Sequence, residues 1–208
     1  MIRNFNLQIE RSVNLEALGW PDRGTAGQDG LRCNRAYMDL RGLSWGQVQE
    51  VLDLEKRLVG ILQVEGDFKH HLAQVNHELE ELYEDAEEGL FGLDLGVASS
   101  VVALSAARCI PFSSCNGGVF GDHHEETHPL VSFFVRPACV PLLLDIATAA
   151  QVGIYNSDDG AVVYGEILDM LSFAEHMYAR QTSFDRLKFS RVDQVHATKR
   201  QHELPFSE

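Results

Sequence analysis

Two consecutive stretches of helical apolar periodicity, between Ser44 and Glu88, constrain the fold of this chain most strongly. Ser44 is a typical N-cap residue, and apolar residues recur after it on helical spacing to about Gln63. Gly66 interrupts this pattern, and a second helix is expected from about Asp67 to Glu88. Its apolar residues are spaced alternately by four and three positions, at Phe68, Leu72, Val75, Leu79 and Leu82. Two adjacent amphipathic helices joined by a short turn predict an αα-hairpin.

The residues at the start of the chain follow a different pattern. Phe5, Leu7 and Ile9 alternate with polar residues, so they lie on one side of an extended backbone. This alternation predicts a short strand over residues 2–10.

The second half of the chain alternates helices with short apolar strands. From Gly92 to Arg180 the expected order is helix, strand, strand, helix, strand, helix. The helices are expected at 94–108, 141–153 and 167–178, and the strands at 109–112 and 130–135. Residues 154–164, with turn residues at 156–160, predict either a pair of strands or a single interrupted strand. This order predicts an α+β fold, with the N-terminal αα-hairpin followed by a small sheet that has helices packed on one face.

The patterns divide the chain into three parts. Residues 1–91 would form an N-terminal strand and an acidic helical hairpin, residues 92–180 an α+β domain, and residues 181–208 a basic tail. With 208 residues, of which 45% are apolar, the chain has enough material for a hydrophobic core.

Net charge is distributed unevenly and narrows the choice of partners. Before Arg180 there are 27 acidic and 11 basic residues, whereas from Arg180 onward there are six basic and four acidic ones. Because so acidic a body repels phosphate backbones, broad nucleic-acid binding is disfavoured. We expect instead a protein partner that binds the acidic helical hairpin.

Cysteine usage and the apolar runs bear on localisation. The four cysteines, Cys33, Cys109, Cys115 and Cys139, form no C-x-x-C pair, which indicates reduced thiols in a cytoplasmic protein. The first residues lack the apolar core of a signal peptide, and no run has the length of a membrane span. We therefore expect a cytoplasmic protein without membrane insertion.

The segment from Ser113 to His128 gathers the residue types that most often carry chemistry. It combines a thiol, a glycine turn and three histidines between two apolar runs. The glycine turn predicts a ligand-binding loop, because its backbone N–H groups are suited to an anion. That loop would consist of Ser114, Asn116, Gly117 and Gly118. Cys109, about 20 Å away along an extended strand, is expected to be a core thiol instead.

Three interpretations of this segment remain open. Cys115, His124 and His128 are residue types that zinc accepts, so zinc is the candidate cofactor. Without a metal, the segment would bind an organic or anionic ligand, and Cys115 is a candidate nucleophile with His123, His124 or His128 as its base. The third interpretation is a polar hairpin loop without chemistry.

The acidic cluster of the second predicted helix suggests a carboxylate metal site at first sight. Helical-bundle metal sites typically have Glu followed three residues later by His. The nearest match here, His77 followed four residues later by Glu81, has the reverse order and the wrong spacing. Most of these acidic residues also lie off the apolar stripe. The cluster therefore indicates a solvated acidic face.

The run from Ile110 to Gly118, with Asp94-Leu95-Gly96 before it and Pro129-Leu130 after it, resembles a group of small bacterial proteins of unassigned function. Their shared pattern is a helix, a strand ending in Ser-Cys-x-Gly, and a strand beginning near Pro. More remotely, the stretch from Ser113 to Gly117 is similar to the Ser-Ser-Cys-Ser-Gly-Arg motif of the wybutosine-synthesising tRNA methyltransferase family. Asn116 stands where that motif has the Ser after its Cys, and Gly118 replaces its Arg. The resemblance implies a site around Cys115.

Two functions follow from these patterns. The first is an interaction or accessory protein of a bacterial assembly, with the acidic hairpin as docking surface and the second half as a ligand-binding module. The second is a small enzyme that uses Cys115 and nearby histidines, with or without zinc. The sequence favours the first, because no complete catalytic constellation can be assembled from it.

Overall fold

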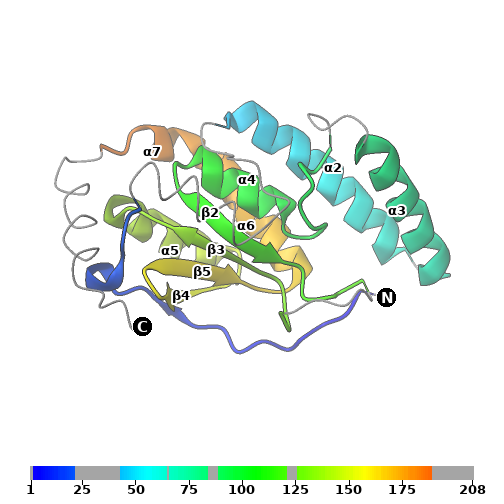
Figure 1. Cartoon of the computed structure of the whole chain (residues 1–208), viewed down its shortest axis with the longest axis horizontal. Helices are drawn as coiled ribbons and strands as arrows, with labels where there is room; N and C mark the ends of the chain where they lie inside the picture. The colour runs from blue at the N-terminus through cyan, green and yellow to red at the C-terminus, as the bar shows by residue number, and fades with distance from the viewer. Residues whose placement is uncertain (1, 22–42, 65, 84–88, 121–125, 189–208) are drawn as a thin grey trace, which may run out of the picture.

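The computed structural model describes residues 2–21, 43–64, 66–83, 89–120 and 126–188. It has the α+β fold that the sequence predicts, with a five-stranded sheet and helices on one of its faces (Figure 1). The helices are α2 (Trp45–Gln63), α3 (Phe68–Tyr83), α4 (Ala98–Ala106), α5 (Val140–Ala149), α6 (Ile167–Ala179) and α7 (Gln181–Asp185). The strands are β1 (Arg11–Ser12), β2 (Ile110–Cys115), β3 (Leu130–Phe134), β4 (Gly153–Ser157) and β5 (Gly160–Tyr164).

The sheet has the strand order β1-β4-β5-β3-β2. All neighbouring pairs are antiparallel except β1 and β4, which run parallel. β4 and β5 form a hairpin, so residues 154–164 are a pair of strands rather than a single interrupted strand. The β2–β3 pair places Cys115 opposite Leu130, so the candidate site lies at the end of this outer pair of strands.

Successive side chains of a strand point to opposite faces of the sheet, and the two faces pack against different parts of the chain. Val131, Phe133 and Val163 face a core that they share with α4, α5 and α6. On the other face, Leu130, Val162 and Tyr164 form a smaller cluster that Leu7 and Ile9 cover. The start of the chain, rather than a second layer of helices, therefore covers this face of the sheet.

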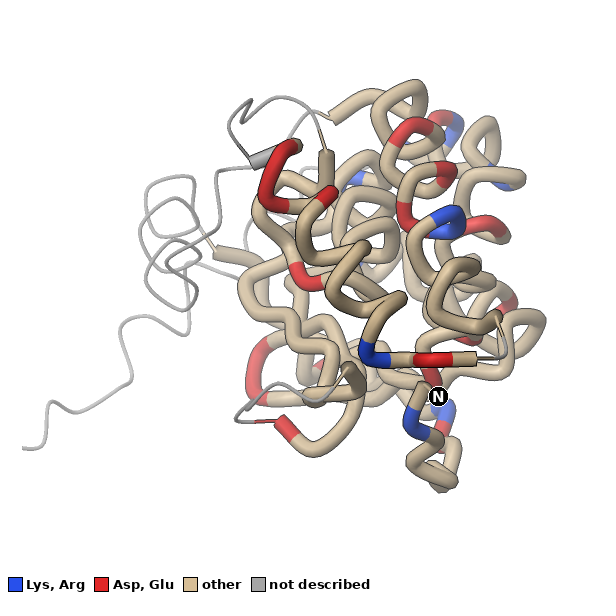
Figure 2. Tube along the Cα trace, turned by 90° about the vertical axis from the view of Figure 1, so that its right-hand side faces the viewer, with Lys and Arg blue, Asp and Glu red and all other residues tan. Residues whose placement is uncertain are grey.

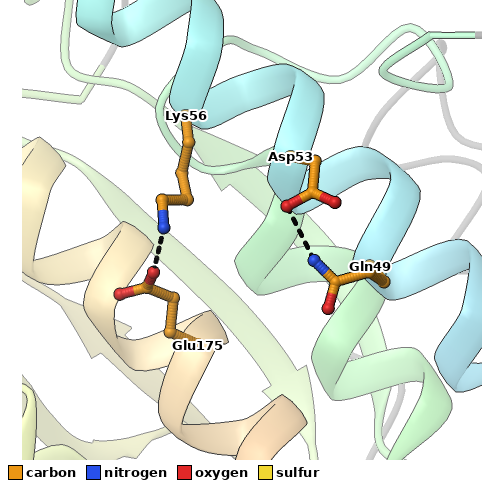
Figure 3. Close-up of polar contacts among 4 residues, drawn as sticks. All are labelled: Gln49, Asp53, Lys56 and Glu175. Atoms are coloured by element: carbon orange, nitrogen blue, oxygen red, sulfur yellow. Dashed lines mark hydrogen bonds and ion pairs between the residues drawn. The ribbon is translucent and has the colours of Figure 1, made fainter.

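Helix α2 packs outside this first helical layer, on α4 and α6. It begins as predicted: the Ser44 side chain accepts the N–H of Gln47, and the Gln47 side chain accepts the N–H of Ser44, which forms a capping box. Lys56 forms an ion pair with Glu175 of α6, and Gln49 donates to Asp53 at 2.7 Å along α2 (Figure 3). Both contacts are exposed, so buried apolar residues provide most of the α2 packing energy.

Helix α3 packs on α2 and completes the predicted αα-hairpin. Arg57 of α2 pairs through both guanidinium nitrogens with the Glu78 carboxylate of α3. The pKa of Glu78 is accordingly lowered by Arg57. The predicted helix extends to Glu88, of which residues 84–88 lie outside the described part of the chain.

The strand predicted over residues 2–10 is not formed there, and this prediction was wrong. Strand pairing at the chain start is limited to Arg11 and Ser12, which pair with β4. Asn6 has a φ of 52°, a left-handed conformation that interrupts an extended strand. Leu7 and Ile9 still share a face, as the alternation predicts, whereas Phe5 packs against the main core.

Residues 181–208, which the sequence predicts to be a basic tail, begin with helix α7. Phe184 of α7 is buried and its ring lies 5.8 Å from the ring of Trp45. The Trp45 indole N–H also donates to Asp185 at 3.2 Å. Helix α7 therefore packs on the start of α2. Residues 189–208 lie outside the described part. Within that part, no helix combines the length and apolar character that a membrane crossing requires.

Candidate functional site

Cys115 is the last residue of β2, and its side chain is buried where the strand leads into the glycine turn. Ser114, one residue earlier, pairs with Val131 in the sheet. Asn116 is also buried and donates from its side-chain amide to the Leu95 carbonyl at 3.3 Å. The turn is thus fixed against the segment that precedes α4.

The backbone N–H groups of the turn already donate to acceptors within the protein. The N–H of Asn116 donates to Asp94 Oδ2 at 3.3 Å, and that of Gly117 to Cys115 Sγ at 3.3 Å. The N–H of Gly118 donates to Asn116 Oδ1 at 2.9 Å. An anion bound to Asn116, Gly117 or Gly118, as the sequence predicts, would have to replace these bonds.

Gly117 brings the turn into direct contact with His128. Its φ is +70°, and a Cβ at this position would lie 2.4 Å from the His128 Cα. Only glycine fits so close to a neighbouring backbone. The structure therefore brings two of the predicted site residues, Cys115 and His128, onto adjacent segments.

The His128 side chain is oriented by its own neighbours. Its Nδ1 lies 3.1 Å from the Thr127 hydroxyl, and its ring packs edge-on against Tyr164 with 5.5 Å between centroids. The Tyr164 hydroxyl donates to the Gln8 carbonyl and accepts the N–H of Glu10, both at 2.8 Å. Tyr164 thus supports the chain start, because its hydroxyl is engaged by backbone groups.

The environment of Cys115 favours the thiol over the thiolate. Burial raises the pKa of Cys115, and the carboxylates of Asp94 and Glu126 raise it further. Backbone N–H groups of Gly117 and Glu126 lower the pKa in part. Since the thiolate is the reactive form, this arrangement does not activate Cys115 as a nucleophile.

Only some of the residues proposed to bind zinc belong to the described part of the chain. Within the described ranges, no group of three or more His, Cys, Asp or Glu side chains is arranged to hold a metal ion. His123 and His124 lie outside those ranges. The zinc set of Cys115, His124 and His128, and the role of His123 as a base, therefore stay predictions.

The predicted core role of Cys109 is confirmed. Cys109 is 1% exposed, and it lies beside Cys139, which is also buried. The hydrogen bond with Cys139 and burial hold the pKa of the Cys109 thiol well above its usual value. Both thiols belong to the core and are separate from the Cys115 turn.

A buried carboxylate fixes the segment on which the Cys115 turn rests. Glu55 of α2 is 0% exposed, and its Oε1 accepts the N–H groups of Gly96 at 2.6 Å and Ala98 at 2.9 Å. Its Oε2 accepts the N–H of Ser99 at 2.9 Å. Glu55 thus binds the N-terminus of α4, where anionic groups are favoured. Through Asp94 and Leu95, the same segment holds Asn116.

Sequence reasoning missed Glu55, although the sequence contains a signal for it. In the helical pattern, Glu55 falls three and four positions from Leu52, Val51, Leu58 and Val59, all of which are buried. An acidic residue inside an apolar face needs internal hydrogen-bond donors, because an unpaired buried charge is too costly. The position of Glu55 predicts such donors, but their identity depends on the tertiary fold.

Comparisons with protein-family models, with curated proteins and with solved structures find no match to this chain. The functional proposals therefore rest on the geometry and chemistry of its own residues.

Proposed function

We propose that this chain is an interaction or accessory protein of a bacterial assembly, which docks a partner protein through the acidic face of α3. In this proposal the α+β part is the scaffold and ligand-binding module that carries the hairpin. The observation that carries the proposal is the placement of α3 as an outer helix with exposed carboxylates.

Helix α3 contributes little buried surface to the fold. Val75 is fully buried, whereas the other side chains from Phe68 to Leu82 are exposed or half-buried. The contact with α2 includes the exposed Arg57–Glu78 ion pair. Helix α3 is therefore an outer helix that contacts the rest of the fold mainly through α2.

The exposed carboxylates in the described part of α3 lie near its C-terminal end. Glu80 and Glu81 are exposed. Glu81 Oε1 lies 3.5 Å from His77 Nε2, and the two side chains are 70% and 73% exposed. Viewed from the side on which α2 and α3 lie, the chain carries more acidic than basic positions (Figure 2). Such a surface is complementary to a basic partner, which it attracts by long-range electrostatics.

The test is partner capture in cells with charge-reversal variants. The full chain, with a tag at its C-terminus, is crosslinked in its host and the attached proteins are identified by mass spectrometry. We expect one partner to be captured by the unmodified chain and lost from the double variant Glu80→Lys/Glu81→Lys. The matched control is Asp145→Lys, which reverses a 75% exposed charge on α5, a helix that packs on the sheet and α6. Equal capture by all three proteins would refute docking through α3.

A second candidate function is a small enzyme that uses Cys115 and nearby histidines. The observation in its favour is the contact of Gly117 with the His128 backbone, which places the thiol and an imidazole on adjacent segments. The raised pKa of Cys115 opposes it. Stoichiometric zinc in the purified chain, lost in a His124→Ala/His128→Ala variant, would favour this second function over the first.

A further inference from the structure

A groove of about 680 Å³ lies where three separate segments of the chain meet. The segments are the chain start, the connection between α2 and α3, and the first turn of α6. Its volume falls within the range of specific binding sites in proteins. The groove is separate from the Cys115 turn, because none of the residues that line it belongs to that turn.

Specific contacts hold the walls of this groove in place. The N–H of Phe5 donates to both carboxylate oxygens of Glu166, at 3.0 and 3.1 Å, which ties the chain start to the beginning of α6. Leu62 and Ile167 are both 1% exposed and form part of the apolar wall. The groove is therefore built from ordered backbone and core residues.

The rim of the groove exposes two large aliphatic side chains. Val64 is 60% exposed and Leu168 is 47% exposed. Among the described residues, only Leu15 is a further large hydrophobic side chain with comparable exposure, and it does not line the groove. Exposed aliphatic residues gathered at a groove are typical of a surface that another protein covers.

The polar part of the groove is negatively charged. Glu166 and Asp169 line it, and no Lys or Arg is among its described lining residues. The pKa of Asp169 is raised by burial and by the neighbouring Glu166 carboxylate. Arg3, between two lining residues in the sequence, stacks its guanidinium over the Phe5 ring at 4.7 Å. A cation from outside the chain would therefore relieve the repulsion between these two carboxylates.

We propose that this groove binds a peptide segment of the partner protein in which Lys or Arg stands next to a large apolar side chain. The basic group would pair with Asp169 and Glu166, and the apolar side chain would cover Val64 and Leu168. A small ligand inside the groove would leave the exposed aliphatic rim uncovered, so the observations favour a peptide.

This inference rests on the proposed function and specifies the partner chemistry. The groove lies at the first residues of α3, near Phe68, whereas Glu80 and Glu81 lie near its other end. At about 1.5 Å per residue these two places are roughly 18 Å apart along the helix. Loss of binding at one place can therefore be distinguished from loss at the other.

The experiment uses a random displayed peptide library, selected against the full chain with its tag at the C-terminus. Selected peptides are synthesised and titrated calorimetrically at physiological salt against the unmodified chain, against single variants and against Glu80→Lys/Glu81→Lys. We expect enrichment of peptides that combine Lys or Arg with a large apolar residue. Their affinity should fall roughly tenfold in Leu168→Ser and roughly threefold to tenfold in Asp169→Asn. The matched control Leu15→Ser removes an equally exposed leucine elsewhere and should bind like the unmodified chain.

Three results would overturn the inference. One is a failure to enrich any peptide, and another is selected peptides whose affinity is unchanged in both groove variants. The third is selected peptides that lose affinity in Glu80→Lys/Glu81→Lys but not in Leu168→Ser. That last result would leave docking through α3 intact and remove only the groove from the interface.

Discussion

Replacement of Glu55 is the perturbation whose energetic effect the structure defines best. Glu55 is fully buried, and its two carboxylate oxygens accept three backbone N–H groups at the N-terminus of α4. Glu55→Ala removes the acceptor for all three groups at once. Glu55→Gln keeps a carbonyl oxygen of similar shape but replaces the other oxygen with a donor.

The expected loss of stability follows from the number of hydrogen bonds. A buried N–H left without its acceptor costs about 1–3 kcal/mol, so three of them set a minimum of about 3 kcal/mol. Disruption of a buried, hydrogen-bonded charge generally costs about 3–5 kcal/mol. We therefore expect Glu55→Ala to lose about 3–5 kcal/mol of unfolding free energy, and Glu55→Gln about 1–3 kcal/mol. For a domain at the low end of the usual range of about 5–15 kcal/mol of stability, the alanine variant would be close to unfolding.

The dependence on pH provides an independent check. Burial raises the pKa of Glu55 above its ordinary value of 4.5, against the opposing hydrogen bonds from Ser99, Gly96 and Ala98. The folded chain then holds the Glu55 proton more tightly than the unfolded chain does. The stability that this tighter proton binding contributes is complete below a pH of about 4.5, and it is lost as the pH rises through the folded-state pKa of Glu55.

Urea unfolding of the unmodified chain and of both variants, at several pH values from 4 upward, measures these effects. The advantage of the unmodified chain over Glu55→Gln should narrow as pH rises. A loss below about 1 kcal/mol in Glu55→Ala would refute the assignment of Glu55 as the anchor of α4. An advantage that grows with pH would show that the hydrogen bonds, rather than burial, dominate the Glu55 pKa.

Three further predictions concern the site and the hairpin. Gly117→Ala should lose about 1–3 kcal/mol in urea unfolding, because its Cβ would collide with the His128 backbone at a φ of +70°; unchanged stability would contradict the close contact. Alkylation of Cys115 in a Cys33→Ser background should have a pH midpoint above the value of about 8.5 for a free cysteine; a midpoint below it would contradict the thiol assignment. Ser44→Ala should lose about 1 kcal/mol of unfolding free energy with the capping box of α2, whereas an exposed substitution such as Gln74→Ala should not.

Local patterns predicted those parts of the fold that local chemistry determines. Ser44 marked the start of α2 as an N-cap, and the structure adds that Gln47 completes a capping box within four residues. The turn residues between β4 and β5 marked the break in this segment but left open whether it forms a strand pair or a single interrupted strand. The alternation at Phe5, Leu7 and Ile9 correctly placed Leu7 and Ile9 on one side. It was wrong for Phe5, which packs against the main core, and for the strand, which needs a partner strand. Asn6 in a left-handed conformation interrupts the backbone there.

The site was predictable only in part, for the same physical reason. The sequence placed Cys115 at a strand end beside glycines, which the structure confirms. It did not predict the hydrogen bond from the Asn116 N–H to the Asp94 carboxylate, because Asp94 lies 22 residues away in the sequence. The groove between Val64, Leu168 and Asp169 also depends on segments far apart in the sequence. Tertiary contacts, which periodicity does not encode, determine both.

The central claim is that a partner binds through α3 rather than that Cys115 performs chemistry. The most direct measurement is the dissociation constant of the captured partner, purified and titrated against the unmodified chain, Glu80→Lys/Glu81→Lys and Cys115→Ser. We predict roughly tenfold or greater weakening in the charge-reversal variant and no change in Cys115→Ser. Unchanged binding in the charge-reversal variant, with loss of binding in Cys115→Ser, would contradict the account.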